Sequence, residues 1–463
     1  MTHAPNSLAA RDIAYSLHPY TNLKTHLENG PHIITGGKGV RVFDESGKSY
    51  IEGLSGLWCT ALGFSEERLI EAATKAMRQL PFYHSFGGKA SGPVIDLAEK
   101  LIELAPVPMS KVFFANSGSE ANDTAIKIVR YVNNAWGRPE KKKIIARNKA
   151  YHGVTIATAS LTGLPNNHRD FDLPMDGVLH TACPHHSRFA LPGETEQEFA
   201  TRCAEDLETM ILDEGPETVA AFFAEPVMGA GGVIVPPAGY FEKVQAVLKK
   251  YDVLFVADEV ICGFGRTGNF WGSQTFSLKP DMITCAKALS SAYLPISALM
   301  VSEPIFEAMA RESEKIGIFG HGFTYGGHPV SASVALEALK IYEERDIVGH
   351  VRTIAPALQG GLRALGNHPL VGETRGVGLI GALDLVKDKA EKTSFNPADG
   401  VAPYLWDRIE KNGVITRVLG DTVAFAPPLI IEQAEIEEML DAVSRALDET
   451  ADWAAKRGLI RTV

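Results

Sequence analysis

The sequence predicts an α/β protein built on a mostly parallel sheet flanked by helices, together with a smaller α+β domain. Two observations lead to this fold class. Between residues 112 and 301 the chain carries six short apolar runs that do not alternate with polar residues. Runs of this kind are typical of strands that are covered on both faces. Amphipathic helical patterns separate the runs, and strands that alternate with helices favour a layered α/β architecture.

Residues 1–65 are expected to form an N-terminal segment that contributes to the smaller domain. The segment begins with a helical pattern over Ser7–Leu17. A hairpin-like stretch follows at Ile33–Phe43 and turns at Asp44–Gly47. Asp, Ser and Gly are common turn residues, because the first two bond their own backbone and glycine accepts a positive φ.

Residues 66–330 are expected to form the large domain, and residues 331–463 the small C-terminal α+β domain. The predicted strands of the large domain are Val112–Ala115, Ile144–Ala146, Val219–Ala224, Val253–Ala257, Met282–Cys285 and Ser297–Val301. Its clearest helical patterns are Ser119–Asn134, Glu196–Leu212 and Tyr240–Lys250. The small domain is entered through the helical pattern Val330–Glu344 and has strands around Gly376–Val386 and Val414–Leu429.

Charge and cysteine content exclude several classes of function. The 463 residues include 45 Lys and Arg against 56 Asp and Glu, a formal net charge of −11. A nucleic-acid partner is not expected, because phosphate binding needs a concentrated basic surface. The five cysteines form no CxxC pair, so neither a disulfide framework nor a metal site is predicted. No segment has the features of a secretory signal or of a membrane helix, so we expect a cytoplasmic enzyme without a membrane partner.

Two residues that follow predicted strands carry the chemistry of the candidate site. Asp258 ends the run that begins at Val253, and Lys287 follows the strand Met282–Cys285. Side chains at the carboxyl ends of parallel strands point into the crevice where open α/β sheets bind ligands. Taken singly, Asp258 could cap the next loop and Lys287 could extend its charge into solvent. Together they supply what a pyridoxal-phosphate site needs, a lysine that forms a Schiff base and a carboxylate beside the pyridine nitrogen.

A serine–glycine turn opens the first long helical pattern. The segment Asn116–Asn122 follows the strand Val112–Ala115. A helix that begins in this way offers free backbone N–H groups and a positive dipole end to an anion. A plain N-cap would explain the serines equally well, so phosphate capture would need further donors.

Three other motifs carry less information. Tyr151, after the strand Ile144–Ala146, could stack on a cofactor ring or fill the core. The string Gly376–Gly381 matches GxGxxG but lies in a strand-like run, so a dinucleotide site is dismissed. Cys183-Pro184-His185-His186 is interpreted as a loop, because no further metal ligands accompany it.

Taken together, these segments resemble the class III (ω-) aminotransferases, which have the type I fold of pyridoxal-phosphate-dependent transferases. The resemblance covers nearly the whole chain. In order, its motifs are Ser55-Gly56-Leu57-Trp58, Asn116-Ser117-Gly118-Ser119-Glu120-Ala121, Tyr151-His152-Gly153, Glu225-Pro226, Val256-Ala257-Asp258-Glu259-Val260, Gly263-Phe264-Gly265-Arg266-Thr267-Gly268, Lys287, His321-Gly322-Phe323-Thr324-Tyr325 and Ala426-Pro427-Pro428-Leu429.

The resemblance implies a pyridoxal 5'-phosphate cofactor and assigns its contacts. Lys287 would hold the cofactor and later move the proton, and Asp258 would pair with the pyridine nitrogen. The remaining implied contacts are Ser117, Gly118 and Ser119 at the phosphate, Tyr151 and Val260 on the two ring faces, Glu225 in support, and Phe323 with Thr324, which would reach the phosphate of the neighbouring subunit. Such a contact implies a homodimer with shared active sites, and dimers could pair into tetramers.

The implied reaction is a ping-pong transfer of an amino group from an amine or ω-amino acid to pyruvate or a similar 2-oxo acid. Arg417 matches the arginine that binds the acceptor carboxylate and swings away for apolar amines. Tyr20, Trp58 and Phe86 match the aromatic lining of the amine pocket, together with Tyr151. The simpler readings are a surface arginine and ordinary aromatic packing.

Three alternatives share some of these features. The nearest is an aminotransferase that uses diamines, polyamines or 4-aminobutyrate as the donor. Aminomutases and decarboxylases of the same fold also need Lys287 and Asp258. A cofactor-free binding protein is disfavoured, because the lysine, the aspartate and the serine–glycine turn are all intact.

Overall fold

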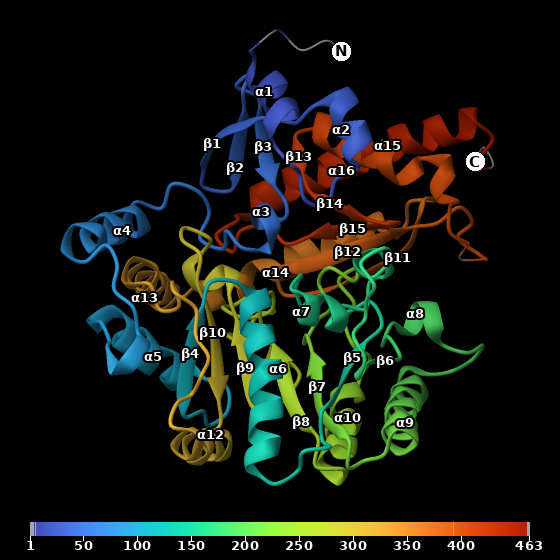
Figure 1. Ribbon diagram of the computed structural model, residues 1–463. Coiled ribbons are helices and arrows are strands. Elements are labelled where there is room, and N and C mark those ends of the chain that lie inside the picture. Colours follow the sequence, from blue (N-terminus) through green and yellow to red (C-terminus); the bar gives the residue numbers. More distant parts are fainter. Residues whose placement is uncertain (1–3, 5, 392, 461–463) are drawn as a thin grey trace.

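A seven-stranded sheet in the order β4-β10-β9-β8-β7-β5-β6 forms the centre of the larger part of the molecule (Figure 1). The computed structural model describes residues 4, 6–391 and 393–460. Neighbouring strands from β9 to β6 run parallel, whereas β10 runs antiparallel to both β4 and β9. The strands are β4 Lys111–Ala115, β5 Lys143–Arg147, β6 Val178–Thr181, β7 Val219–Ala224, β8 Leu254–Asp258, β9 Met282–Cys285 and β10 Ser297–Val301.

The six strands predicted for this sheet are all present, and the sheet is mostly parallel as expected. β6 was not predicted, because it lies at an edge of the sheet and mixes His180 and Thr181 with two apolar residues. Its half-covered position explains why its sequence lacks a continuous apolar run.

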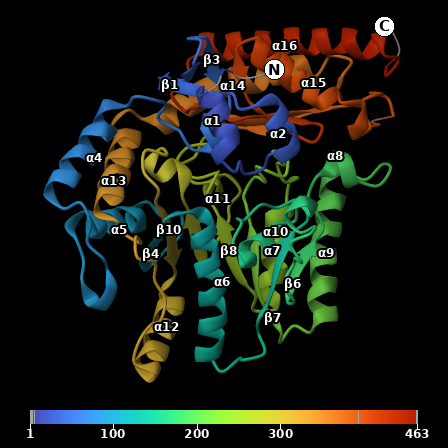
Figure 2. The same cartoon turned by 45° about the horizontal axis from the view of Figure 1, so that its top comes forward.

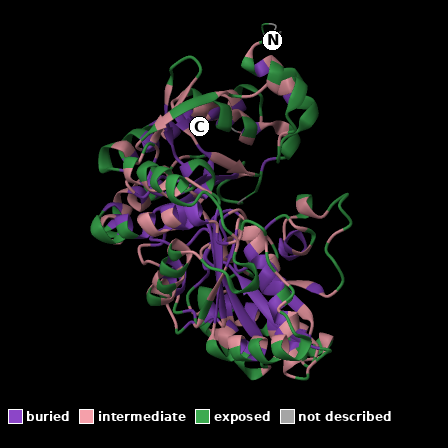
Figure 3. Ribbon diagram, turned by 60° about the vertical axis from the view of Figure 1, so that its left-hand side comes forward, coloured by how far each residue is buried: buried purple, intermediate pink, exposed green. Residues whose placement is uncertain are grey.

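Helices cover both faces of this sheet, and β7 shows why its apolar run does not alternate. Ala221 and Phe223 pack with α6 and α12 on one face, whereas Phe222 and Ala224 pack with α9 and α10 on the other. Successive strand residues point to opposite faces, so burial on both faces requires apolar residues throughout. Figure 3 accordingly shows the central strands as buried. The helices around the sheet are α6 Gly118–Ala135, α7 Ile156–Leu161, α8 His186–Phe189, α9 Glu196–Glu214, α10 Tyr240–Lys250, α11 Gly272–Thr275 and α12 Glu303–Ile316.

Two smaller sheets lie at the other end of the molecule, and one of them joins the first and last parts of the chain. β13 (Val414–Ile415) pairs in parallel with β3 (Ser49–Glu52). β3 pairs antiparallel with β2 (Arg41–Asp44), and β2 pairs antiparallel with β1 (Ile34–Lys38). The other sheet has the order β11-β12-β15-β14, with bounds Val371–Val377, Ile380–Leu385, Thr422–Phe425 and Arg417–Leu419. Figure 1 shows the blue N-terminal strands beside the red C-terminal elements. The division into domains at residues 65 and 330 stays a prediction.

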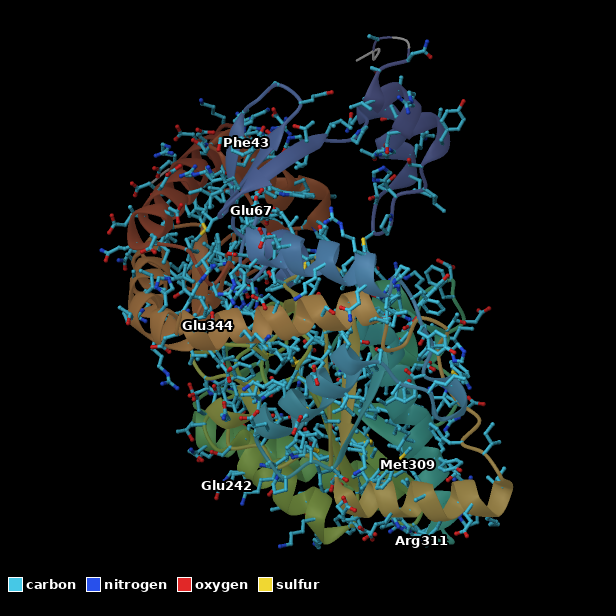
Figure 4. All side chains as sticks on the ribbon, turned by 90° about the vertical axis from the view of Figure 1, so that its left-hand side faces the viewer. Phe43, Glu67, Glu242, Met309, Arg311 and Glu344 are labelled. Carbon is cyan, nitrogen blue, oxygen red and sulfur yellow. The ribbon has the colours of Figure 1, made fainter. Side chains whose placement is uncertain are left out.

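The remaining helices lie around these sheets or connect them to the central one. α4 and α5 pack against α13, and Arg68 of α4 pairs with Glu337 and Glu344 of α13 at 2.6 and 2.7 Å. Figure 4 labels Glu67 and Glu344 on these two neighbouring helices. The bounds are α1 Leu8–Tyr15, α2 Leu23–Asn29, α3 Ser55–Trp58, α4 Glu67–Gln79, α5 Gly92–Leu104, α13 Pro329–Glu344, α14 Ile347–Leu365, α15 Val401–Lys411 and α16 Gln433–Lys456.

The string Gly376–Gly381 spans the tight connection between β11 and β12. Gly378 has a φ of +58° there, and a Cβ at this position would lie 2.4 Å from the Arg266 carbonyl oxygen. The glycines therefore serve a turn and a close backbone approach. Among the described residues, no helix combines the length and apolar character needed to cross a membrane.

Candidate active site

A pocket of about 660 Å³ opens at the carboxyl ends of the central strands. Asp258 ends β8, and Lys287 follows β9 by two residues, so both side chains enter the pocket from the sheet. The structure brings together most of the residues that the sequence singled out, namely Tyr20, Trp58, Ser117, Gly118, Ser119, Tyr151, Glu225, Asp258, Val260, Lys287 and Arg417.

Asp258 is buried and receives three hydrogen bonds. Its Oδ2 accepts from Asn122 Nδ2 at 2.7 Å and from His152 Nδ1 at 2.8 Å, and its Oδ1 accepts from the Val260 backbone N–H at 3.1 Å. A carboxylate offers about four acceptor positions. The three protein donors therefore fix the carboxylate while leaving capacity for one further donor from the pocket.

Lys287 is partly buried at the floor of the pocket and has an uncommon backbone conformation. Its φ is +49°, at the start of a 3-10 turn over Lys287–Ser290. Burial lowers the pKa of Lys287, and the nearby negative charge of Asp258 opposes part of this effect. A lysine with a lowered pKa provides a neutral amine, which is the nucleophilic form.

The turn before α6 forms a cradle of small residues. Ser117 is the N-cap of the helix, and its Oγ accepts from the Glu120 N–H at 3.2 Å. The first N–H groups of a helix have no partner within the helix, and the positive dipole end favours an anion. A Cβ on Gly118 would lie 3.0 Å from the Val260 side chain, so glycine keeps this approach open.

Glu225 positions Tyr151 at the edge of the pocket. Its Oε1 accepts from the Tyr151 N–H at 3.0 Å and its Oε2 from the Gly229 N–H at 2.9 Å. Burial raises the pKa of Glu225 and also that of the Tyr151 phenol. Glu225 is therefore a buried support at the strand ends, and Tyr151 is partly exposed to the pocket.

Arg417 and Tyr20 lie at the small-domain side of the pocket. The Arg417 guanidinium carbon is 5.8 Å from the centre of the Tyr20 ring, within the range of a cation–π contact. The Tyr20 hydroxyl accepts from Asn167 Nδ2 at 2.6 Å. Trp58 also lines the pocket, but unlike the exposed Tyr20 its side chain is almost fully buried, with 2% of its surface exposed.

Phe86, Phe323 and Thr324 are not among the described residues that line the pocket of their own chain. The Phe86 ring is half exposed and lies against Gly322, where a Cβ would be 2.9 Å from the ring. The sequence prediction that Phe86 lines the amine pocket is therefore not met within one chain. The reason is that Phe86 lies in a short 3-10 turn (Phe86–Gly88) that packs beside the loop carrying Phe323.

Residues 24–447 match the family model described as aminotransferase class-III. The chain belongs to this family. Gamma aminobutyrate transaminase 1, mitochondrial, of Solanum lycopersicum is 54% identical over 435 residues, which are 94% of this chain and 84% of the relative.

Solved structures of omega transaminases are similar to this chain over nearly its whole length. The omega transaminase from Pseudomonas jessenii in complex with PMP gives a TM-score of 0.95 at 56% identity, covering 96% of this chain and 99% of that one. A thermostable omega transaminase variant, W58M/F86L/R417L, engineered for asymmetric synthesis of enantiopure bulky amines, gives 0.96 at 56% identity, covering 96% and 100%.

The chain is thus an aminotransferase with the type I fold of pyridoxal-phosphate enzymes, as the sequence predicted. Class III aminotransferases use pyridoxal 5'-phosphate, and the pocket fits that group. The turn before α6 suits its phosphate, the remaining acceptor capacity of Asp258 suits a ring N–H, and the amine of Lys287, whose pKa burial lowers, suits its carbonyl carbon.

Sequence reasoning gave no role to Asn122 or His152, although both contact Asp258 directly. His152 stands in the motif Tyr151-His152-Gly153, and Asn122 lies one helical turn after Gly118. Asn122 follows Gly118 by four residues and therefore lies on the same helix face as the phosphate cradle. This spacing could have indicated that Asn122 belongs to the site.

Proposed function

We propose that this aminotransferase moves an amino group from an amine or ω-amino acid to pyruvate or a similar 2-oxo acid in a ping-pong reaction. The observation that carries the proposal is that Lys287, the buried Asp258 and Arg417 line one and the same pocket. Lysine and aspartate serve amino transfer, and a guanidinium is suited to bind a carboxylate in a bidentate manner.

The chain's own side chains divide the work of the reaction. When bound, pyridoxal phosphate supplies an electrophilic carbonyl and a ring that accepts electron density from the substrate carbon. The Nζ of Lys287 holds the cofactor, and after displacement by the donor it moves a proton at the substrate carbon. Asp258 keeps a positive charge at the ring nitrogen, and its three fixed hydrogen bonds maintain its orientation.

The phosphate is assigned to the turn Ser117–Ser119, and the two ring faces to Tyr151 and Val260. The Gly118–Val260 approach supports this arrangement, because it brings the phosphate cradle and one ring contact together. Glu225 supports the site by holding the backbone of Tyr151.

Two kinds of relatives support different donors. The tomato relative is named a gamma aminobutyrate transaminase, and the structural relatives are named omega transaminases. The engineered relative carries exchanges at a Trp, a Phe and an Arg with the types and numbers of Trp58, Phe86 and Arg417. This match supports a pocket for apolar amines, and 4-aminobutyrate is the second candidate donor because of the tomato relative.

An Arg417→Ala variant tests how carboxylates are recognised. A charge-assisted pair contributes about 1.5–3 kcal/mol, so kcat/KM for pyruvate in the second half-reaction should fall about 10- to 150-fold. The half-reaction with an apolar amine such as 1-phenylethylamine should change by less than about threefold, whereas 4-aminobutyrate should lose as much as pyruvate. The control is Arg445→Ala, an exposed arginine on α16. Equal losses with the amine and with pyruvate would contradict the proposed role.

We further propose a homodimer in which Phe86, Phe323 and Thr324 reach the pocket of the other copy. Their position outside their own pocket supports this, as does the exposure of Phe86 and Tyr325 on neighbouring segments. Co-expression of Lys287→Ala chains with Thr324→Ala chains should create one intact site per mixed dimer and restore activity. No recovery, or a monomer in sedimentation, would contradict shared sites. A cytoplasmic location stays a prediction, since the tomato relative is named as mitochondrial.

A further inference from the structure

A cluster of three metal-ligating side chains lies in the N-terminal arm (residues 7–30), outside the active site. Asp12 belongs to α1, His18 to the following loop and His26 to α2. The Nε2 atoms of His18 and His26 lie 2.8 and 3.0 Å from the same carboxylate oxygen, Asp12 Oδ2. We propose that this cluster binds one Zn²⁺ ion per chain.

The chemistry and spacing of the three groups suit zinc. Imidazole nitrogen and carboxylate oxygen are common zinc ligands, with bonds of ~2.0–2.2 Å in a tetrahedral arrangement. In that geometry neighbouring ligand atoms are about 3.4 Å apart, so each histidine would have to move outward from Asp12 by about half an ångström. The ligand atoms of all three residues already lie within 4.8 Å of one another. Three protein ligands leave the fourth position for water.

A second cluster shows by contrast why Asp12 is suited to a metal ion. His185, Glu373 and Asp384 are also close together. Their two carboxylates, however, pair with Arg375 at 3.1 and 2.8 Å, and Asp384 pairs with Arg188 as well. Guanidinium groups thus already neutralise that cluster. Among the described residues, no lysine or arginine forms an ion pair with Asp12, whose carboxylate contacts the two imidazoles and the Ser16 side chain.

Apart from the contacts of Tyr20 with Asn167 and Arg417, the N-terminal arm buries few residues that could hold it in one conformation. α1 has 8 residues and α2 has 7, and isolated helices of this length are unstable in water. Their buried residues are Ala9 alone in α1 and His26 alone in α2. Figure 3 shows the two helices of the arm at the edge of the molecule with mostly exposed residues, and Figure 4 shows them from another side. An ion bound to residues 14 positions apart would close this segment into a loop and stabilise it.

The site would also fix one wall of the active-site pocket. Pro19 and Tyr20 lie between the ligands His18 and His26 in sequence, and both line the pocket. Figure 2 shows α1 and α2 in front of the C-terminal elements. The ion would take no part in amino transfer and would restrain Tyr20 beside Arg417. This consequence rests on the proposed function, whereas zinc binding itself does not.

The test is a zinc titration of the tag-free holoenzyme after dialysis against a chelator. We expect one Zn²⁺ per chain by calorimetry and by metal analysis, with a rise in Tm on binding. Asp12→Asn and His18→Gln should each weaken binding at least about tenfold. The control is His32→Gln, because His32 also pairs with carboxylates and is 33% exposed, against 32% for His18. This control should bind zinc like the parent.

Co²⁺ provides a second readout, since tetrahedral coordination by the parent and by His32→Gln should give visible d–d bands that His18→Gln lacks. Circular dichroism and aminotransferase activity show that each variant is folded. Absence of stoichiometric binding by the folded parent, or equal binding by Asp12→Asn, His18→Gln and the parent, would overturn the proposal. Zinc binding without any change in the KM of amines would contradict the restraint on Tyr20 but not the zinc site, whereas failure of the Arg417→Ala test would contradict the proposed function alone.

Discussion

Replacing Asp258 by asparagine should remove most of the activity while leaving the fold intact. The structure gives Asp258 one role toward the ring nitrogen, which is to hold a positive charge there. An opposite charge in contact shifts such an equilibrium by ~1–3 pKa units, or about 1.4–4 kcal/mol. The amide also creates a mismatch, because its nitrogen must face either the Val260 N–H or the donors of Asn122 and His152. We therefore expect Asp258→Asn to lower kcat/KM by about 10- to 1,000-fold.

The assay compares kcat/KM for amine and pyruvate with cofactor content and circular dichroism. Asp281→Asn is the matched control, because Asp281 lies just before β9 at the opposite end of the sheet and accepts from the Phe255 N–H at 2.8 Å. It should lose stability but retain kcat/KM within about twofold. If Asp258→Asn were as active as Asp281→Asn at full cofactor content, the argument from ring charge would be refuted.

Three further changes test separate parts of the site. Gly118→Val places a side chain against Val260, and overpacking of about 1–3 kcal/mol should weaken pyridoxal-phosphate binding about 5- to 150-fold in an absorbance titration; unchanged affinity would exclude the cradle. Asn122→Ala leaves Asp258 without one donor, and should lower the free energy of unfolding by about 1.5–3 kcal/mol in urea. Burial raises the pKa of Glu259 from 4.5 to about 7. The folded state holds this proton more tightly than the unfolded state, so the contribution of Glu259 to the free energy of unfolding is full below about pH 4.5 and is lost as the pH rises through 7. Glu259→Gln should therefore remove up to about 3 kcal/mol of the pH dependence of that free energy. Identical pH profiles of parent and variant would contradict this prediction.

The central sheet was predictable because burial on both faces leaves a local mark in the sequence. Strands such as Val219–Ala224 are apolar at every position, and no knowledge of their neighbours is needed. The edge strand β6 lacks this mark, since water reaches part of it. The two-strand pairing of β3 with β13 joins residues more than 350 positions apart, and no local pattern encodes such a contact.

The residues of the site likewise fall into those that the sequence could predict and those that it could not. Asp258 and Lys287 were predictable, because a charged residue at the end of a buried strand, or within two residues of it, is unusual. The partners Asn122 and His152 come from other elements and meet Asp258 only in three dimensions. The same holds for Asp12, His18 and His26, which form no recognisable motif in sequence and whose contact depends on how two short helices pack. The position of Phe86 against Gly322 was beyond sequence reasoning, since the two residues lie more than 200 positions apart in the chain.

The most direct test of the account follows the cofactor absorption of the purified enzyme through the two half-reactions. Addition of an amine should bleach the band of the bound cofactor, and addition of pyruvate should restore it. A Lys287→Ala variant should bind pyridoxal phosphate without this cycle and should lose amino transfer by at least about a thousandfold. If the Lys287→Ala variant completed the cycle at the parental rate, Lys287 would not be the catalytic lysine and the central claim would be wrong.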